Sequence, residues 1–373
     1  MSPLRKVKMV RGPAKVTIRG RCMVLGADVS DSVVAVRAGK ALPFEPEPYC
    51  RFGMKMGQGA RVWDASPFNA GISIWKGVPR SVLSAVEQQG KLTVLVMGNV
   101  DTGKSTFCTF LANTAIKRGF LPCIIDGDIG QGDFAPPSAM GAAVLTKQLT
   151  DLRDATASVF GFVGSISPAG IEQLVEDALY NLSLRSRNLA PLVIINTDGY
   201  ARDSGIKYKR MIADKIQPDM IILMGRNGPL ESALASNSWR LIKARSSGQE
   251  LKSWSERQWR RHDQFLRFVG EGLIRVSLDR MEFSYLGNNL SSSDLASISG
   301  TDSDPGLRDV FVGLGSNGVV VGFGVIRNIG RDFVELHTDL HDFDAIHLSN
   351  IRLSGGEAEQ ITLEMPGRVS QEN

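Results

Sequence analysis

The sequence predicts an α/β protein with a mostly parallel central sheet and a small β domain on each side of it. Its middle part alternates continuous apolar runs with helical stretches, whereas both ends hold short apolar runs broken by glycine and proline. A length of 373 residues suits two or three domains. We therefore expect a β domain over residues 1–88, an α/β domain over 89–277 and a second β domain over 278–373.

The N-terminal part has the pattern of short strands. Apolar and polar residues alternate over stretches such as 16–18, 32–37 and 59–63, with glycine or proline between them. Residues 71–75, with sequence GISIW, follow the same alternation and are also predicted to form a strand. Near Pro79 the pattern becomes helical, which places the link to the next domain there.

The central part predicts a parallel sheet. Its continuous apolar runs are of the kind found in strands that are buried on both faces, and helical stretches separate them. The runs cover residues 92–97, 123–125, 159–163, 192–195 and 220–224. Alternating strands and helices of this kind are typical of a doubly wound α/β domain.

The C-terminal part predicts strands again. The helical patterns end near residue 275, and apolar runs with glycine turns follow at 311–314, 318–326 and 333–337. A segment rich in serine and aspartate, residues 291–305, precedes these runs and is predicted to be a loop.

Composition limits the class of protein. Hydrophobic residues make up 43% and charged residues 22%, which is typical of globular proteins, and no apolar run is long enough for a membrane span. The basic N-terminus is not followed by an apolar segment, so we expect no secretory signal. The four cysteines show no CxxC spacing and are predicted as core residues of a reducing compartment. We expect a soluble protein of the cytoplasm or nucleus, whose net charge of +4 is compatible with a polyanionic partner.

A phosphate-binding motif follows the first central strand. Residues 98–105 read GNVDTGKS, which fits G-x-x-x-x-G-K-[ST] between a predicted strand and a predicted helix. In such a P-loop the backbone N–H groups face phosphates, Lys104 adds a positive charge, and the Ser105 hydroxyl suits Mg²⁺. We therefore predict a P-loop nucleoside-triphosphatase domain that binds ATP or a close relative. The residues expected at the nucleotide are Gly98, Asn99, Val100, Asp101, Thr102, Gly103, Lys104, Ser105 and Thr106.

Two carboxylates follow the second central strand, in the sequence DGDIGQ of residues 126–131. Ligands of doubly wound sheets bind at the carboxyl ends of the strands, so we expect Asp126 and Asp128 beside the P-loop. One carboxylate can hold Mg²⁺ while the other takes a proton from an attacking hydroxyl or water. The order in the chain leaves open which does which, and Asp126 is equally suited to cap the following segment.

Two further stretches offer groups for an acceptor substrate. The sequence NTDGY of residues 196–200 ends the fourth apolar run, and Tyr200 there suits either stacking on a base or closing the core. Residues 239–275 are rich in arginine, lysine and tryptophan. Such a charge run is often a solvated face, but Arg257 and Arg261 are spaced i, i+4, as expected of a lid helix that brings guanidinium groups over transferring phosphates. We place this lid at about residues 230–270.

These motifs together resemble the polynucleotide 5'-hydroxyl kinase family, which includes the RNA kinase subunit of pre-mRNA cleavage and tRNA-splicing complexes and the ribosomal-RNA processing kinase. The resemblance is strongest in residues 98–106, 128–131 and 196–200, in the arginine pair, and in the C-terminal stretch 312–324. It implies a β domain, a kinase domain and a second β domain. It also implies transfer of the γ-phosphate of ATP to a 5'-hydroxyl end of RNA or DNA, with RNA-processing proteins as further partners.

The resemblance also implies a role for individual residues. Lys104 and Ser105 would bind phosphate and metal, and Asp128 would be the base for the 5'-hydroxyl, which leaves Asp126 as the candidate for the second metal ligand. Arg257 and Arg261 would be catalytic lid residues. The residues implied at the acceptor are Gln131, Thr197 and Tyr200, the last standing where the family usually has tryptophan.

Two other functions are compatible with the same motifs. The first is a partner-regulated P-loop ATPase that acts in an RNA-processing assembly without kinase activity. The second is a protein in which the nucleotide is a structural ligand. The motifs leave open RNA or DNA, single or double strand, the pathway served and the oligomeric state.

Overall fold

The structure is a computed structural model that describes residues 6–66, 72–75, 77–246, 253–298, 306–354 and 357–363. The chain divides into two compact units. The first unit comprises Met1–Asp128, Ala142–Ser158 and Tyr180–Glu256, and the second comprises Ile129–Gly141, Val159–Leu179 and Arg257–Asn373. Strand β11 (Ala139–Val144) and helix α3 (Glu172–Ser186) run from one unit into the other. The three domain boundaries expected from the sequence stay a prediction.

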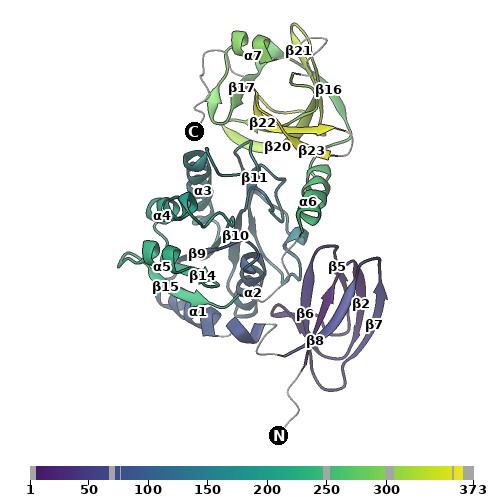
Figure 1. Cartoon of the computed structure of the whole chain (residues 1–373), viewed down its shortest axis with the longest axis vertical. Coiled ribbons are helices and arrows are strands. Elements are labelled where there is room, and N and C mark those ends of the chain that lie inside the picture. The colour runs from purple at the N-terminus through teal and green to yellow at the C-terminus, as the bar shows by residue number, and fades with distance from the viewer. Residues whose placement is uncertain are drawn as a thin grey trace. The chain divides into compact units, whose positions relative to one another are not determined.

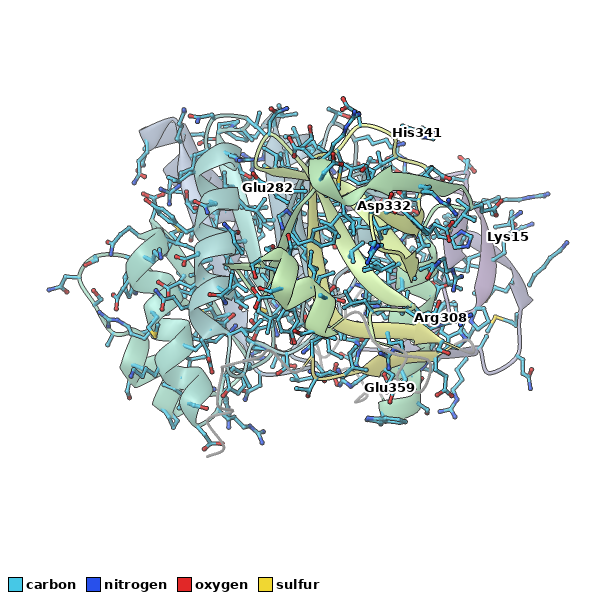
Figure 2. All side chains as sticks on the ribbon, turned by 90° about the horizontal axis from the view of Figure 1, so that it is seen from above. Lys15, Glu282, Arg308, Asp332, His341 and Glu359 are labelled. Atoms are coloured by element: carbon cyan, nitrogen blue, oxygen red, sulfur yellow. The ribbon has the colours of Figure 1, made fainter. Side chains whose placement is uncertain are left out.

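The N-terminal strands of the first unit form two small sheets (Figure 1). One sheet has the order β4-β3-β6-β1-β8 and the other the order β5-β2-β7. The strands are β1 (Val7–Arg11), β2 (Ala14–Arg19), β3 (Cys22–Val24), β4 (Ala27–Asp28), β5 (Val33–Val36), β6 (Ala41–Pro46), β7 (Arg51–Met56) and β8 (Arg61–Ala65). In β2 the side chains of Val16 and Ile18 are buried while those between them are exposed, so one face of its sheet is solvated. Lys15 is on this exposed side (Figure 2).

A parallel sheet carries the rest of the first unit. Its strands are β9 (Leu92–Gly98), β10 (Pro122–Gly127), β13 (Leu192–Thr197), β14 (Met220–Met224) and β15 (Arg240–Ala244), in the order β15-β14-β9-β13-β10. All residues of β9, β10, β13 and β14 are buried, as expected of strands covered on both faces. The predicted fold class is confirmed. Because β13 lies between β9 and β10, residues that follow these three strands meet at one edge.

Helices flank this sheet: α1 (Gly77–Gln89), α2 (Lys104–Lys117), α4 (Ser204–Ile216) and α5 (Gly228–Leu234). Helix α2 also contacts the N-terminal strands, because Asn113 Nδ2 donates to the Leu25 carbonyl over 2.8 Å and Phe110 lies against Gly26. This contact joins the N-terminal β region to the helix that begins at the P-loop.

The second unit is mostly antiparallel. Its strands are β12 (Val159–Phe162), β16 (Leu273–Ser277), β17 (Glu282–Tyr285), β18 (Asn288–Asn289), β19 (Val310–Ser316), β20 (Val319–Ile329), β21 (Phe333–His337), β22 (Ala345–Ser354) and β23 (Glu357–Gln360). Only the pair β17 and β22 is parallel among the described pairings of these strands. The core holds Val312, Ile326 and Leu336, each fully buried.

Three predicted elements differ from the structure. Ile72–Trp75 is a 3-10 helix, η1, where a strand was expected, and Gly71 lies outside the described residues. This turn buries Trp75, whose Nε1 donates to the Arg245 carbonyl over 2.8 Å and whose ring meets Phe107 edge-on. Alternation over five residues therefore indicated the wrong element, because a single buried tryptophan determined the local conformation.

The run 159–163 was expected in the parallel sheet, but β12 pairs antiparallel with β20 in the second unit. Its phenylalanines pack there: Phe160 lies 5.1 Å from Phe323 between ring centroids, and Phe162 lies 6.2 Å from Phe311. A short apolar run does not encode its strand partner, so the assignment to the parallel sheet was wrong.

Helices also continue beyond residue 275, where the sequence predicted only strands and loops. Helix α7 (Ser292–Ile298) lies in the serine-rich segment, and a 3-10 helix, η3, spans Leu278–Arg280. Ser291 caps α7: its Oγ accepts from the Asp294 amide, while the Asp294 carboxylate accepts from the Ser291 amide. This reciprocal S-x-x-D pattern marks the start of a helix. The prediction of a loop rested on the serine-rich composition and did not use this pattern. Residues 299–305 lie outside the described part.

Across the described helices, none combines the length and apolar character needed to cross a membrane.

Candidate nucleotide site

The P-loop connects β9 to α2 with a backbone shape that needs glycine. Gly98 has a φ of 151° and Gly103 a φ of 89°, and a Cβ on Gly98 would lie 2.5 Å from the Met224 carbonyl oxygen of β14. Asp101 also has a positive φ, 59°. The loop ends at the first turn of α2, where unpaired N–H groups and the helix dipole favour an anion.

Lys104 is held inside this loop. Its Nζ donates to the carbonyl oxygens of Gly98, over 3.1 Å, and Asn99, over 2.9 Å, and the residue is only 7% exposed. Burial lowers the pKa of Lys104, and the Asp128 carboxylate opposes that effect. The side chain therefore lies inside the loop, close enough to Asp128 for the two groups to interact electrostatically.

The side chain of Asn99, the second residue of the P-loop, has a hydrogen-bond partner. Its Oδ1 accepts from Asn227 Nδ2 over 3.0 Å, and Asn227 caps the N-terminus of α5 through the Leu230 amide. The asparagine thus fixes the start of the P-loop to the next helix in the sheet.

Asn196, at the end of β13, connects the P-loop to the second motif. Its Nδ2 donates to Ser105 Oγ over 3.2 Å and to Asp126 Oδ1 over 2.9 Å. Asp126 is 1% exposed, so this bond also satisfies a buried carboxylate. The hydroxyl and the carboxylate predicted as metal ligands are therefore brought to one point, with Asn196 between them.

This point fits a hard divalent cation. Hydroxyl and carboxylate oxygens are the ligands that Mg²⁺ prefers, and the buried Asn196 Oδ1 has no hydrogen-bond partner among the described residues. The described residues hold no group of three or more His, Cys, Asp or Glu side chains suited to a metal. A Mg²⁺ here would need phosphate oxygens and water as its remaining ligands, which is how P-loop proteins hold it.

Asp128 is half-buried and lies at the same edge. Its amide donates to Asp126 Oδ1 over 3.4 Å, and its carboxylate raises the pKa values of both Lys104 and Lys209 against the larger effect of burial. Of the two predicted carboxylates it is the one that solvent reaches.

A buried ion pair supports this edge, and the sequence did not predict it. Asp198 Oδ1 accepts from Lys209 Nζ over 2.8 Å, and Asp198 Oδ2 accepts from the Tyr208 hydroxyl over 2.9 Å. Lys209 is fully buried, and burial lowers its pKa while Asp198 opposes that. The available signal was a lysine on the apolar face of α4, in register with Gly205, Ile212 and Ile216.

The stretch after β13 lies against the P-loop. A Cβ on Gly199 would meet Val100 Cγ2 at 2.4 Å, so only glycine permits this approach. Tyr200 is half-buried; its amide donates to Asp198 Oδ1 over 2.8 Å and its hydroxyl is paired with Ser204. The Thr197 hydroxyl is fully buried and donates to the Val96 carbonyl over 3.0 Å.

The other predicted site residues belong to the second unit. Arg257 and Arg261 lie on helix α6 (Trp254–Leu266), both half-buried. Arg261 Nη1 donates to Gln258 Oε1 over 3.0 Å, and Gln131 Nε2 donates to the Arg257 carbonyl over 3.4 Å. The structure thus brings Gln131 next to the arginine helix of the second unit. The predicted site residues at the sheet edge of the first unit are Lys104, Ser105, Asp126, Asp128, Thr197 and Tyr200.

Helix α6 is anchored by residues that the sequence did not single out. Arg260 Nη2 donates to the Gln131 carbonyl over 2.9 Å and to Asp133 Oδ1 over 2.8 Å, and Asp133 is buried. Gln264 donates to the Asp133 carbonyl over 3.0 Å, and Phe265 packs on Phe311 with ring centroids 4.8 Å apart. The loop that follows the second motif is therefore bonded to the arginine helix.

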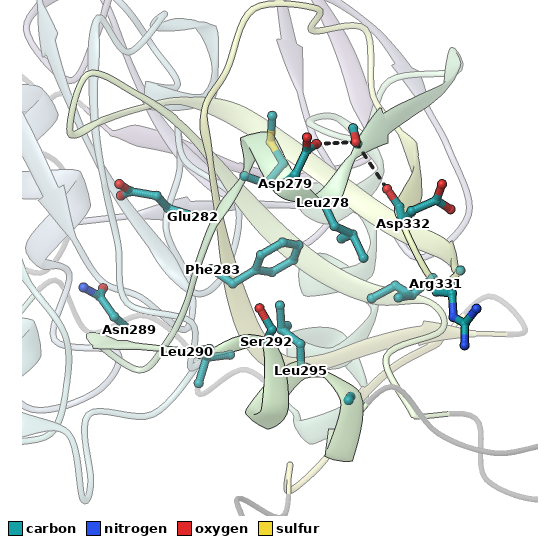
Figure 3. Close-up of a pocket in the computed structure, with 15 residues that line it drawn as sticks. Leu278, Asp279, Glu282, Phe283, Asn289, Leu290, Ser292, Leu295, Arg331 and Asp332 are labelled. Carbon is teal, nitrogen blue, oxygen red and sulfur yellow. Dashed lines mark hydrogen bonds between the residues drawn. The ribbon is translucent and has the colours of Figure 1, made fainter.

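A pocket of about 1030 Å³ in the C-terminal strands is the wrong place for a triphosphate (Figure 3). Leu278, Phe283 and Leu295 are among the apolar residues that line it. Its charged lining consists of Asp279, Glu282, Asp332 and Arg331. Three acidic groups against one basic group repel an anion, whereas the P-loop presents N–H groups and a lysine.

The glycine loop, its buried lysine, and the Ser105 and Asp126 pair define a P-loop nucleotide-binding domain. Residues 98–269 match the family described as the mRNA cleavage and polyadenylation factor CLP1 P-loop. The resemblance expected from the motifs is confirmed over this segment of the chain.

Similar proteins carry kinase names. The chain is 32% identical over 202 residues to a polyribonucleotide 5'-hydroxyl-kinase of Pyrococcus horikoshii, which covers 53% of this chain and 56% of the relative. It is 30% identical over 142 residues to the polyribonucleotide 5'-hydroxyl-kinase Clp1 of Xenopus laevis, covering 35% of this chain and 32% of that protein. The matches thus span little more than half of the archaeal relative and about a third of the Xenopus protein.

A solved structure extends the likeness in fold to nearly the whole chain. Wild-type Clp1p, in a complex with Pcf11p, superposes with a TM-score of 0.70 and covers 94% of this chain and 96% of that one. At 13% identity the match shows a shared fold.

Proposed function

We propose that this chain is an ATP-dependent polynucleotide 5'-hydroxyl kinase, which transfers the γ-phosphate of ATP to the 5'-hydroxyl end of RNA or DNA. The observation that carries the proposal is the half-buried Asp128 beside a buried P-loop lysine. A carboxylate that solvent reaches at the phosphate edge is suited to accept a proton from an alcohol. The names of the similar proteins support a 5'-hydroxyl as that alcohol.

In this proposal the first unit binds the nucleotide. The N–H groups of residues 98–106 hold the phosphates of ATP, and Lys104 neutralises charge that develops on them. Ser105 and Asp126 would hold Mg²⁺, with Asn196 orienting both through its amide. When bound, the cation supplies positive charge to the phosphate oxygens.

The chemical step is a displacement at the γ-phosphorus. The 5'-oxygen forms a bond to phosphorus as the bond from phosphorus to the ADP oxygen breaks, and the hydroxyl proton passes to a carboxylate oxygen of Asp128. The transition state is loose, so positioning and charge neutralisation supply most of the acceleration. The burial of Asp126, and the hydrogen bond that its Oδ1 accepts from Asn196, support the choice of Asp128 over Asp126 as the base.

The remaining predicted residues are proposed to act on the acceptor and the transferred group. Arg257 and Arg261 neutralise the transferring phosphate, Tyr200 packs on the terminal nucleotide, and Gln131 binds the acceptor. Thr197 is retained as a predicted acceptor residue, although its hydroxyl already donates to Val96. RNA-processing proteins are proposed as partners, which the Clp1p–Pcf11p complex supports.

The test is transfer of labelled γ-phosphate from ATP to matched 5'-hydroxyl RNA and DNA oligonucleotides, with the Lys104→Ala protein as control. We expect label on the 5' end of at least one strand with the wild type and none with the variant. ATP consumed by the wild type with no labelled oligonucleotide would overturn the kinase and favour the assembly ATPase. ATP bound and left intact would favour a structural nucleotide.

A further inference from the structure

The exposed face of the β5-β2-β7 sheet carries opposed pairs of like charge. In the antiparallel register of β2 and β7, Lys15 lies opposite Lys55 and Arg19 lies opposite Arg51. All four residues are exposed, while the alternate residues Val16 and Ile18 are buried. The four cations therefore point to the same, solvated side of the sheet.

The residues between these two pairs are small. Thr17 lies opposite Gly53 midway between the pairs, and Val33 and Ala35 complete the exposed rows on β5. Val33 is thus the one large apolar side chain among these positions. The face lacks the apolar or aromatic centre that is typical of protein interfaces.

None of the four cations forms an ion pair with a described residue. The carboxylate of Asp31, which precedes β5 by two residues, accepts instead from the Gly20 amide over 2.7 Å. Other cations of the same β region are paired: Lys8 meets Asp64 at 2.8 Å and Arg37 meets Asp154 at 2.6 Å.

Like charges directly opposite each other in a sheet are destabilising. Two such pairs on one face therefore destabilise the folded sheet. They are also exposed, so they contribute nothing to the packing of the core. An external anion removes the repulsion. The pairs lie four residues apart along the strands, roughly 13 Å at about 3.3 Å per residue, so the anion must present charge repeatedly along its length.

An aromatic side chain lies at one end of this face. Tyr49 is 98% exposed and precedes β7 by two residues, at the end that carries Arg51. Cys50 packs against the turn at Gly20, which adjoins Arg19 on β2. An exposed ring beside phosphate-binding cations suits stacking on an unpaired base.

We propose that this face, defined by Lys15, Arg19, Arg51, Lys55 and Tyr49, binds the phosphate backbone of single-stranded RNA. The choice of a polynucleotide among polyanions rests on the proposed kinase function. The face engages the body of the acceptor strand, in a contact that is separate from recognition of its 5' end. Its cations act through charge and bind with little preference for sequence.

The test uses single-stranded RNA of about 20 nucleotides that already carries a 5'-phosphate, so that binding is measured without transfer. Fluorescence anisotropy over a salt series compares the wild type with the double variant Arg19→Gln/Arg51→Gln. The matched control is Arg80→Gln/Arg185→Gln, which removes the same charge from exposed helical positions. Thermal unfolding verifies that each variant is folded.

We expect the slope of log affinity against log salt to fall by about 1.4 in the Arg19/Arg51 variant, at roughly 0.7 per lost phosphate contact, and to stay unchanged in the control. Equal slopes in wild type and both variants would overturn the proposal. So would unchanged RNA binding together with lost binding of poly-glutamate, which would assign the face to an acidic protein.

A second measurement separates this proposal from the kinase itself. Transfer to a 5'-hydroxyl trinucleotide should be unchanged in the Arg19/Arg51 variant, while the KM for a 20-nucleotide acceptor should rise several-fold. Loss of transfer to both acceptors in equal proportion would overturn the separate contact. If the wild type transfers to neither acceptor, the proposed function fails while the anisotropy result still decides the RNA face.

Discussion

Two groups of cations in the first unit are built in opposite ways. Lys104 and Lys209 are buried at the edge of the parallel sheet, and each is tied to particular atoms: the carbonyls of Gly98 and Asn99, and the carboxylate of Asp198. The cations of the β5-β2-β7 face are exposed, lie opposite each other in the strand register, and form no ion pair with the described residues.

The difference separates two uses of positive charge. A desolvated cation interacts strongly with a charge next to it, but only if the two groups keep their positions. It therefore binds a single phosphate or carboxylate. An exposed cation contributes little by itself and is screened by salt, so several must act together on a long anion. Substitutions in the first group should therefore cause large effects that are not additive, and those in the second group small, additive ones.

The largest effect is expected for Lys104→Ala. Loss of the ammonium group should lower phosphate transfer roughly 10³-fold or more, because no other described side chain of the loop supplies a positive charge to the phosphates. The measurement is single-turnover transfer of labelled phosphate. Lys117→Ala, at an exposed position of the same helix, is the control and should retain activity. Comparable rates in the two variants would contradict the assignment of the P-loop.

Lys209→Met should lower the free energy of unfolding by about 3–5 kcal/mol, since it leaves Asp198 buried without its charged partner. Urea denaturation measures the change, with Lys207→Met, exposed on the same helix, as the control. The double variant Asp198→Asn/Lys209→Met should recover part of the loss. A double variant as unstable as the sum of the single ones would show that the ion pair is not coupled.

An intermediate effect is expected for Arg260→Met in the second unit. The substitution removes the ion pair between Arg260 and the buried Asp133 and should cost about 1.5–3 kcal/mol of folding free energy. Arg331→Met, exposed in the same unit, is the matched control. Equal unfolding curves for the two variants would mean that the contact between α6 and the 131–133 loop contributes nothing.

The smallest effect has the opposite sign. Lys55→Thr removes the like charge opposite Lys15 and should raise the free energy of unfolding by about 0.2–1 kcal/mol at low salt. The gain should vanish near 1 M salt, where charges are screened within about 3 Å. A gain that persists at high salt would have to come from strand propensity instead, and would break the comparison between the two groups.

The nucleotide site was predictable where its residues are neighbours in sequence. The P-loop needs a strand, eight residues and a helix in succession, and all of them follow from local patterns. The two carboxylates were also placed correctly at the sheet edge, because every strand of a parallel sheet ends there.

What the sequence did not reveal depends on strand order and on distant contacts. Asn196 joins Ser105 to Asp126 only because β13 lies between β9 and β10, and the apolar runs do not encode that order. Arg260 and Asp133 are 127 residues apart in the chain. The pairing of β12 with β20 was missed for the same reason: a short apolar run does not encode which strand it pairs with, or in which direction.

The close approach of Gly98 to the Met224 carbonyl has a consequence for how a nucleotide enters. A neighbouring strand fixes the first residue of the loop, and Asn227 holds the second through Asn99. The conformation of the loop is therefore preorganised before a nucleotide binds. As a result, ordering the loop costs little of the free energy of binding. A shift of β14 by a fraction of an ångström would therefore displace the first residue of the loop directly.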